Sequence, residues 1–193
     1  MKTIVIDAGH GGADPGAVFD GRLEKDDNLR MALALRDSLV RAGQRVIMTR
    51  STDTYVPLLD RSAISNNNNA DLFISLHRNN SLNPSLNGWE NFVQIGSPLL
   101  NFEYAQNVLN AAVNVGVQLN LGVKQEDFSV LRNTDAPAQL LEMGFISNWI
   151  DNVIFDNNFR KYADAIARGI LISLGEPLVP AAPPLFFEML FRT

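Results

Sequence analysis

The chain contains two histidines, and each stands just after an apolar segment that is typical of a strand. His10 lies in the glycine-rich turn after residues 3–6, and His77 directly follows residues 72–76. In sheets of parallel strands, functional side chains gather at the carboxyl ends of the strands. A lone histidine is most often a surface or core residue, but two in equivalent places favour one shared site.

A metal is the simplest reason for such a pair, because imidazole is a favoured zinc ligand. A catalytic zinc usually has three protein ligands and a water. The chain has no cysteine, so neither a thiolate ligand nor a disulfide is available. Glu24 is a candidate for the third ligand, with Asp26, Asp27 and Glu90 as rivals. A carboxylate at the start of a helix can also serve only the helix dipole, so position alone leaves this choice open.

Glu142 ends the apolar run 138–141 and precedes a glycine two residues later. A carboxylate at the end of an apolar strand loses solvation, which raises its pKa toward the operating pH of a general acid or base. Such a group can take a proton from an activated water and pass it to a leaving amine. A carboxylate that only caps the following loop fits the same position equally well.

These residues need a scaffold in which strands and helices alternate, and the apolar pattern predicts one. We expect strands at residues 3–6, 45–48, 72–76, 89–95 and 139–142, the last broken by Gly144, and a short extended piece at 130–131. Apolar residues recur at helical spacing in segments 28–42, 57–65, 102–115 and 159–174. This alternation predicts one α/β domain with a mostly parallel, twisted sheet flanked by helices.

Composition restricts the class of protein. A chain of 193 residues with 46% hydrophobic and 19% charged residues suits one globular core. No apolar run reaches the roughly 18 residues of a membrane span, so we expect no membrane insertion. The net charge of -5 and the lack of a basic run argue against nucleic acid as a partner. We expect a domain over residues 1–175, followed at 176–193 by a proline-rich linker and an apolar tail, the stub of a wall-binding module or a remnant.

The motifs together resemble the zinc-dependent N-acetylmuramoyl-L-alanine amidases. Residues 4–17 (IVIDAGHGGADPGA) resemble the opening of that family, and residues 24–26 (EKD) its second-ligand motif. Residues 73–77 (FISLH) resemble its third-ligand strand, and residues 141–148 (LEMGFISN) its catalytic-glutamate segment. The motifs occur in the family's order over about residues 3–174, and the ordered set is specific.

The resemblance implies an α/β domain with roughly six strands and one zinc ion held by His10, Glu24 and His77. It implies Glu142 as the general acid/base and peptidoglycan as the partner. The reaction would hydrolyse the amide between the lactyl group of N-acetylmuramic acid and L-alanine. Four cations are candidates for lining a substrate groove: Arg22, Arg50, Lys124 and Arg132.

Two departures from the family have consequences. Arg78 follows His77 where the family usually has a small residue, and we expect it on the surface. The stretch between His77 and residue 102 leaves little room for the helix that blocks the site in some relatives, so we expect an open, constitutively active monomer.

Two other functions are open to the same residues: a zinc peptidase that cuts within the stem peptide, and an inactive wall-binding module. The sequence begins almost at once with an apolar strand pattern, so we expect a chain that either is made without a signal peptide or has lost it. We therefore expect a protein made in the cytoplasm that acts on the cell wall, as a bacteriophage endolysin released through a holin does. A bacterial sporulation or cell-separation amidase is the alternative.

Overall fold

Six strands form the central sheet of the computed structural model, which describes residues 1–117 and 119–178. Their order across the sheet is β4-β1-β5-β8-β6-β7. Only the β6–β8 pair is antiparallel, and the other neighbours are parallel. The prediction of a mostly parallel, six-stranded α/β domain is therefore confirmed. The strand bounds are β1 Thr3–Ala8, β4 Arg45–Met48, β5 Leu72–Asn79, β6 Trp89–Val93, β7 Asn120–Gln125 and β8 Ala138–Phe145.

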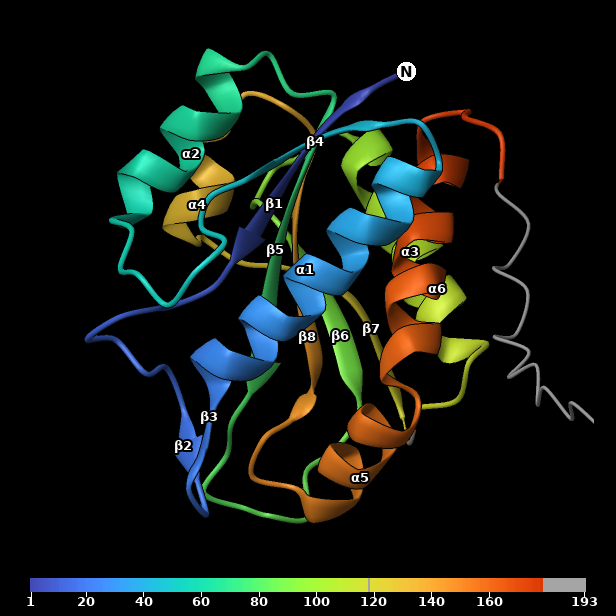
Figure 1. Cartoon of the computed structure of the whole chain (residues 1–193). Coiled ribbons are helices and arrows are strands. Elements are labelled where there is room, and N and C mark those ends of the chain that lie inside the picture. Colours follow the sequence, from blue (N-terminus) through green and yellow to red (C-terminus); the bar gives the residue numbers. More distant parts are fainter. Residues whose placement is uncertain (118, 179–193) are drawn as a thin grey trace, which may run out of the picture.

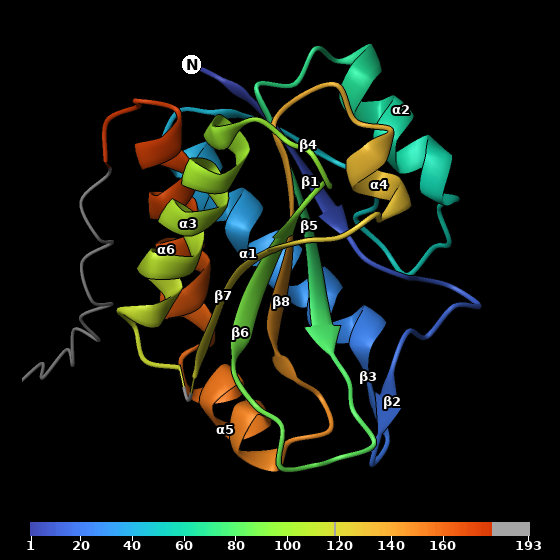
Figure 2. The ribbon, with the colours of Figure 1, turned by 180° about the vertical axis from the view of Figure 1, so that it is seen from behind.

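Helices cover both faces of this sheet (Figures 1 and 2). On one face lie α1 (Glu24–Arg41), α3 (Leu99–Val113) and α6 (Phe159–Ser173), and α6 packs against both of the others. The shorter α2 (Leu58–Asn67) and α4 (Ser129–Arg132) pack together on the other face. A small hairpin of β2 (Val18–Phe19) and β3 (Arg22–Leu23) precedes α1, and α5 (Trp149–Asn157) follows β8.

The two faces bury separate apolar clusters, because side chains alternate along each strand. Ile4 and Ile6 of β1 belong to the larger cluster under α1, α3 and α6. Val5, Phe73 and Leu140 belong to a smaller cluster with residues of α4. Strands buried on both faces explain why β1 and β5 are nearly continuous apolar runs.

Asp7 is the exception in β1, and its burial is fully compensated. Its carboxylate accepts hydrogen bonds from Thr49 Oγ1 and Ser75 Oγ, each at 2.6 Å. It also pairs with the buried guanidinium of Arg61 at 2.7 Å. These bonds join β1, β5, α2 and the residue that follows β4, next to the turn that carries His10.

The predicted segments 3–6, 45–48, 72–76 and 89–95 are strands, and 28–42, 57–65, 102–115 and 159–174 are helical, with some ends displaced. Two predictions about β8 and α4 are wrong. Residues 130–131 lie in α4 rather than in an extended piece. Strand β8 continues through Gly144, because the glycine's φ of 80° is accommodated at a register shift opposite β5.

Beyond α6, residues from 179 onward lie outside the described residues, so the predicted linker and tail at 176–193 stay a prediction. Within residues 1–117 and 119–178, no helix has the length and apolar character needed to cross a bilayer.

Candidate metal centre

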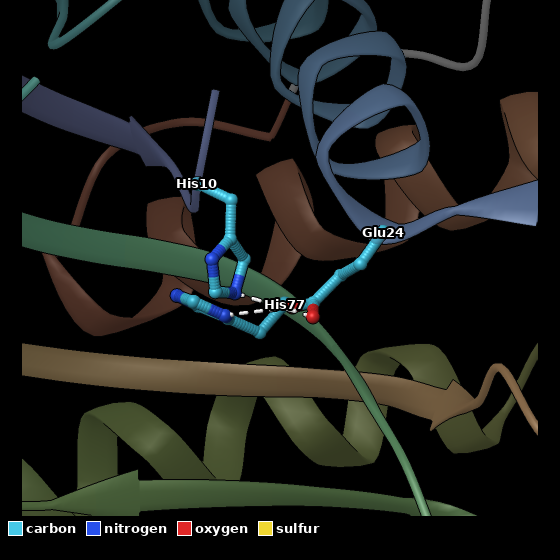
Figure 3. Close-up of side chains that lie close together, drawn as sticks. All are labelled: His10, Glu24 and His77. Carbon is cyan, nitrogen blue, oxygen red and sulfur yellow. Dashed lines mark hydrogen bonds and ion pairs between the residues drawn. The ribbon is translucent and has the colours of Figure 1, made fainter. Parts of the chain in front are cut away.

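Three side chains from distant parts of the chain converge at the carboxyl end of the sheet. His10 comes from the turn after β1, Glu24 from the first residue of α1, and His77 from β5 (Figure 3). His10 Nε2 lies 3.2 Å from Glu24 Oε2, and His77 Nδ1 lies 2.8 Å from Glu24 Oε1. One ligand atom from each residue lies within 4.8 Å of the others. The structure thus brings together the three predicted ligands, and of the rival carboxylates neither Asp26, Asp27 nor Glu90 belongs to this group.

Two glycines make room for these side chains. A Cβ on Gly9 would lie 2.4 Å from His77 Nε2, and a Cβ on Gly16 would lie 2.6 Å from Glu24 Oε2. His10 itself has a φ of 62°, in the left-handed region that residues other than glycine rarely adopt. The backbone of the glycine-rich turn is therefore shaped around the ligand side chains.

Neighbouring groups orient the ligands. Asp14 Oδ2 lies 2.8 Å from His10 Nδ1, which leaves Nε2 of this ring facing Glu24. Asn28 Nδ2 and the backbone N–H of Arg78 both donate to Glu24 Oε1, at 3.2 and 3.1 Å. A carboxylate on the second ring nitrogen is the usual support of a metal-bound histidine. Asp14 and Asn28 were not among the predicted site residues, although each stands four residues after a candidate ligand and so within its reach.

Charge is concentrated at the three ligands. Burial disfavours the ionised carboxylate of Glu24, but hydrogen bonds and charges from His10 and His77 outweigh burial and hold its pKa well below the usual range. Burial likewise disfavours charge on His10, yet Glu24 and Asp14 raise its pKa to about 9. The pKa of His77 is also raised, because Glu24 outweighs the effect of burial. A divalent cation could replace these protons, because metal ligation requires neutral imidazoles.

Glu142 lies beside this group. It is opposite His77 in the β5–β8 register and opposite Glu90 in the β6–β8 register, so the three side chains share one face of the sheet. Its Oε2 is buried without a hydrogen-bond partner among the described residues. Burial first, and then the charges of Glu24 and Glu90, raise its pKa to about 7, although His77 acts in the opposite direction. The carboxyl group is thus poised to exchange a proton near neutral pH.

The prediction that Arg78 lies on the surface is wrong. Its side chain is 1% exposed and its guanidinium donates to Asp27 and Asn152, each at 2.6 Å. The same group lies 4.3 Å from the centre of the Phe155 ring. Burial lowers the pKa of Arg78 to about 10, and it remains a cation at neutral pH. A buried aspartate and an aromatic face on α5 explain how this large residue is accommodated next to His77.

The candidate groove cations lie in different surroundings. Arg50 is 4% exposed and donates to four backbone carbonyls at 2.8–3.2 Å, so it holds the loops under His10 rather than facing a groove. Arg22 is bound to Asp27 and Asp156. Arg132 and Lys124 are about half exposed, and they pair with Asp127 and Glu90.

Comparison with known proteins identifies the family of this chain. The family model described as N-acetylmuramoyl-L-alanine amidase, Amidase_3, matches residues 4–171. The chain belongs to this amidase family. The sporulation-specific N-acetylmuramoyl-L-alanine amidase of Bacillus subtilis (strain 168) is 36% identical over 88% of this chain and 65% of its own length. A probable cell wall amidase, LytH, of Staphylococcus epidermidis is 38% identical over 88% of this chain and 57% of its own length. The chain thus spans roughly three fifths of these two relatives.

The solved amidases share the fold. The catalytic domain of CwlV, an N-acetylmuramoyl-L-alanine amidase from Bacillus (Paenibacillus) polymyxa var. colistinus, superposes with a TM-score of 0.85 at 35% identity. The match covers 92% of this chain and 100% of that domain. An amidase of the same name from Clostridium difficile 630 gives a TM-score of 0.85 at 33% identity, over 90% and 97% of the two chains. The family and these homologues support amide hydrolysis in peptidoglycan as the activity.

Proposed function

We propose that this domain hydrolyses the amide between the lactyl group of N-acetylmuramic acid and L-alanine, using one zinc ion held by His10, Glu24 and His77. The observation that carries the proposal is the convergence of these three ligands beside Glu142, a carboxyl group with a raised pKa. Family membership supports the choice of substrate, and this geometry supports the proposed chemistry.

The donor set fits zinc. Two imidazoles and one carboxylate are the ligands of several catalytic zinc sites, which keep a fourth position open for water or substrate. Gly9 and Gly16 leave space for the candidate ligand side chains, and a Cβ at either position would collide with them. A zinc ion bound there would supply Lewis-acid chemistry, activating water and polarising the scissile carbonyl.

Glu142 supplies the proton transfers. Its ionised form takes a proton from the attacking water, and its neutral form then donates that proton to the nitrogen of L-alanine, which leaves as a free amine. A pKa of about 7 lets both forms be populated at neutral pH. The unpartnered Oε2 is the atom that we assign to this exchange.

Among the four candidate cations, we propose that Arg132 and Lys124 face the substrate, because both are about half exposed. Arg50 holds the backbone of residues 8–9 through their carbonyls, and Arg22 pairs with carboxylates of α1 and α5.

Metal removal tests the proposal against its two alternatives. Chelated protein should release no peptides from purified peptidoglycan, and stoichiometric zinc should restore release of stem peptides whose N-terminal residue is L-alanine. New termini within the peptide would identify a zinc peptidase instead. Binding to peptidoglycan without cleavage, in the presence of zinc, would identify a wall-binding module.

The site has no blocking helix in the described part of the chain, since β6 and loops alone lie between Asn79 and Leu99. We therefore propose a constitutively active, monomeric enzyme that acts on the cell wall. The relatives named above are bacterial proteins, so the endolysin setting and holin release stay predictions.

A further inference from the structure

A pocket of about 400 Å³ lies at the end of β8 opposite to Glu142, between the start of α3, α4 and the loop before β8. Its volume is within the range of small-ligand sites, about 300–1,000 Å³. The lining combines polar and apolar groups, among them Gln94, Asn101, Leu131, Arg132 and Ala138. Nothing in the zinc and Glu142 chemistry uses this pocket.

The pocket and Glu142 share one face of the sheet. Ala138, Leu140 and Glu142 alternate along β8, so their side chains point to the same side. Across β6, Phe92 pairs with Leu140 and Glu90 pairs with Glu142. Helix α4 covers only one end of this face (Figure 2). A partly buried, apolar strip of Phe92 and Phe128 thus separates the metal centre from the pocket.

The separation matches the reach of a short peptide. Ala138 and Glu142 are four residue steps apart along β8, which is about 13 Å at about 3.3 Å per residue. An extended peptide covers about 3.3–3.6 Å per residue. A stem peptide whose first amide lies at Glu142 would therefore bring its third and fourth residues to the pocket.

We propose that this pocket binds the distal part of the stem peptide, with Arg132 facing its carboxylate. The inference rests on the proposed function and names the subsite that would give it peptide specificity. The lactyl carboxyl group of N-acetylmuramic acid is used in the amide bond, so the glycan there has no free carboxylate. The stem peptide ends in a free carboxylate, which a cation can bind. The guanidinium of Arg132 lines the pocket and pairs with Asp127 at 2.6 Å, but both side chains are about half exposed, so the peptide carboxylate could take the place of this aspartate. Lys124, paired with Glu90 on the same face, adds a second cation along the path.

Two matched substrates test the subsite: N-acetylmuramoyl-L-alanyl-D-isoglutamine, which is too short to reach the pocket, and the N-acetylmuramoyl pentapeptide with the same first two residues. With the zinc-loaded wild type, kcat/KM for the pentapeptide should exceed that for the dipeptide by about tenfold, because remote binding energy is used at the reacting centre. The ratio should fall to about one in Ser97→Trp, which fills the pocket, and by at least about threefold in Arg132→Gln. Arg160→Gln, an exposed arginine on α6, should keep the wild-type ratio.

Equal rates for the two substrates in the wild type, or an unchanged ratio in both pocket variants, would overturn the subsite while the amidase activity stands. If Ser97→Trp does not fold, the surface variant Arg132→Gln alone decides. Lack of cleavage of both substrates and of whole peptidoglycan by the wild type would instead refute the proposed function, and the subsite with it.

Discussion

The carboxyl group of Glu142 lies in surroundings that favour its neutral form, which suits proton transfer and opposes ionisation in the folded state. Its pKa is about 7 in the fold, against 4.5 in its absence. Stability from this group is complete below about pH 4.5 and is lost as the pH rises through 7, because folding then requires an ionised, buried carboxylate.

We therefore expect Glu142→Gln to stabilise the metal-free protein at pH 8 by about 2 kcal/mol and to have no such effect at pH 4.5. Urea denaturation at the two pH values measures the difference. Glu103→Gln, an exposed residue of α3, is the control and should show no pH-dependent gain. A destabilised Glu142→Gln at pH 8 would contradict the burial argument.

A comparison of alanine at Gly16 with alanine at Gly21 separates the effect of backbone strain from the effect of crowding at the candidate ligands. Both have positive φ, 65° and 77°, but only a Cβ on Gly16 meets neighbours, at 2.6 Å from Glu24 Oε2 and His10 Cδ2. Alanine at either position should cost about 1–2 kcal/mol of unfolding free energy. Zinc affinity, measured by competition with a chelator, should fall about tenfold or more in Gly16→Ala alone. Equal zinc affinities in the two variants would show that the space left by Gly16 has no part in metal binding.

At the scale of single residues, the strand pattern predicted that both histidines and Glu142 belong to one site, left Glu24 as one of several candidates for the third ligand, and missed the residues that support this group. Both histidines and Glu142 follow apolar strands, and that pattern is visible in the chain itself. The burial of Arg78 is not visible, because it depends on Asp27 and Phe155, which the fold brings from α1 and α5. From sequence alone an arginine is most simply placed on the surface, because the buried partners that could accommodate it cannot be identified.

Ion pairs between arginines and aspartates join the elements around the candidate metal centre. Arg78 of β5 and Arg22 of β3 both pair with Asp27 in the first turn of α1, the turn that begins with Glu24. Arg22 and Arg30 both reach Asp156 of α5. The network therefore fixes the start of α1, and with it the ligand carboxylate, against two strands and a helix.

Arg78→Met should destabilise the protein by about 2–3 kcal/mol, because Asp27 stays buried with only Arg22 and the more distant Arg30, at 3.9 Å, as cationic partners. The matched control is Arg36→Met, which breaks an exposed pair with Asp37 and should cost about 0–1 kcal/mol. Urea unfolding of both variants measures the two losses in unfolding free energy. A loss in Arg78→Met no larger than that of the control would show that the buried network contributes little.

Periodicity predicted the long elements and failed for short ones. Helices α1, α3 and α6 were visible from apolar spacing. Strand β7 was missed because its half-exposed segment 120–125 (NLGVKQ) carries a glycine and no regular alternation. Residues 130–131 were expected to be extended, yet they form α4, because tertiary packing against α2 decides the conformation of so short an apolar piece.

The whole molecule brings residues 10, 24, 77 and 142 to one end of the sheet by its strand order. The parallel neighbours β1, β5 and β8 end side by side. The first turns of α1 lie next to the turn that follows β1, where Asn28 donates to the carbonyl of Gly9. The sequence predicted the parallel sheet. It did not predict that β6 is antiparallel to β8, or that β6 shares a face with Glu142 and the pocket; both follow only from the strand order. We expect the domain to act as one rigid frame for the candidate metal ligands, Glu142 and the proposed peptide subsite.

The most direct test of this account is mass spectrometry of peptidoglycan digested by the zinc-loaded wild type and by zinc-loaded Glu142→Gln. The wild type should release intact stem peptides with free N-terminal L-alanine, and the variant should bind zinc as tightly but release none above background. Peptides cut elsewhere, or unchanged release by the variant, would contradict the assignment of zinc-assisted amide hydrolysis with Glu142 as the proton carrier.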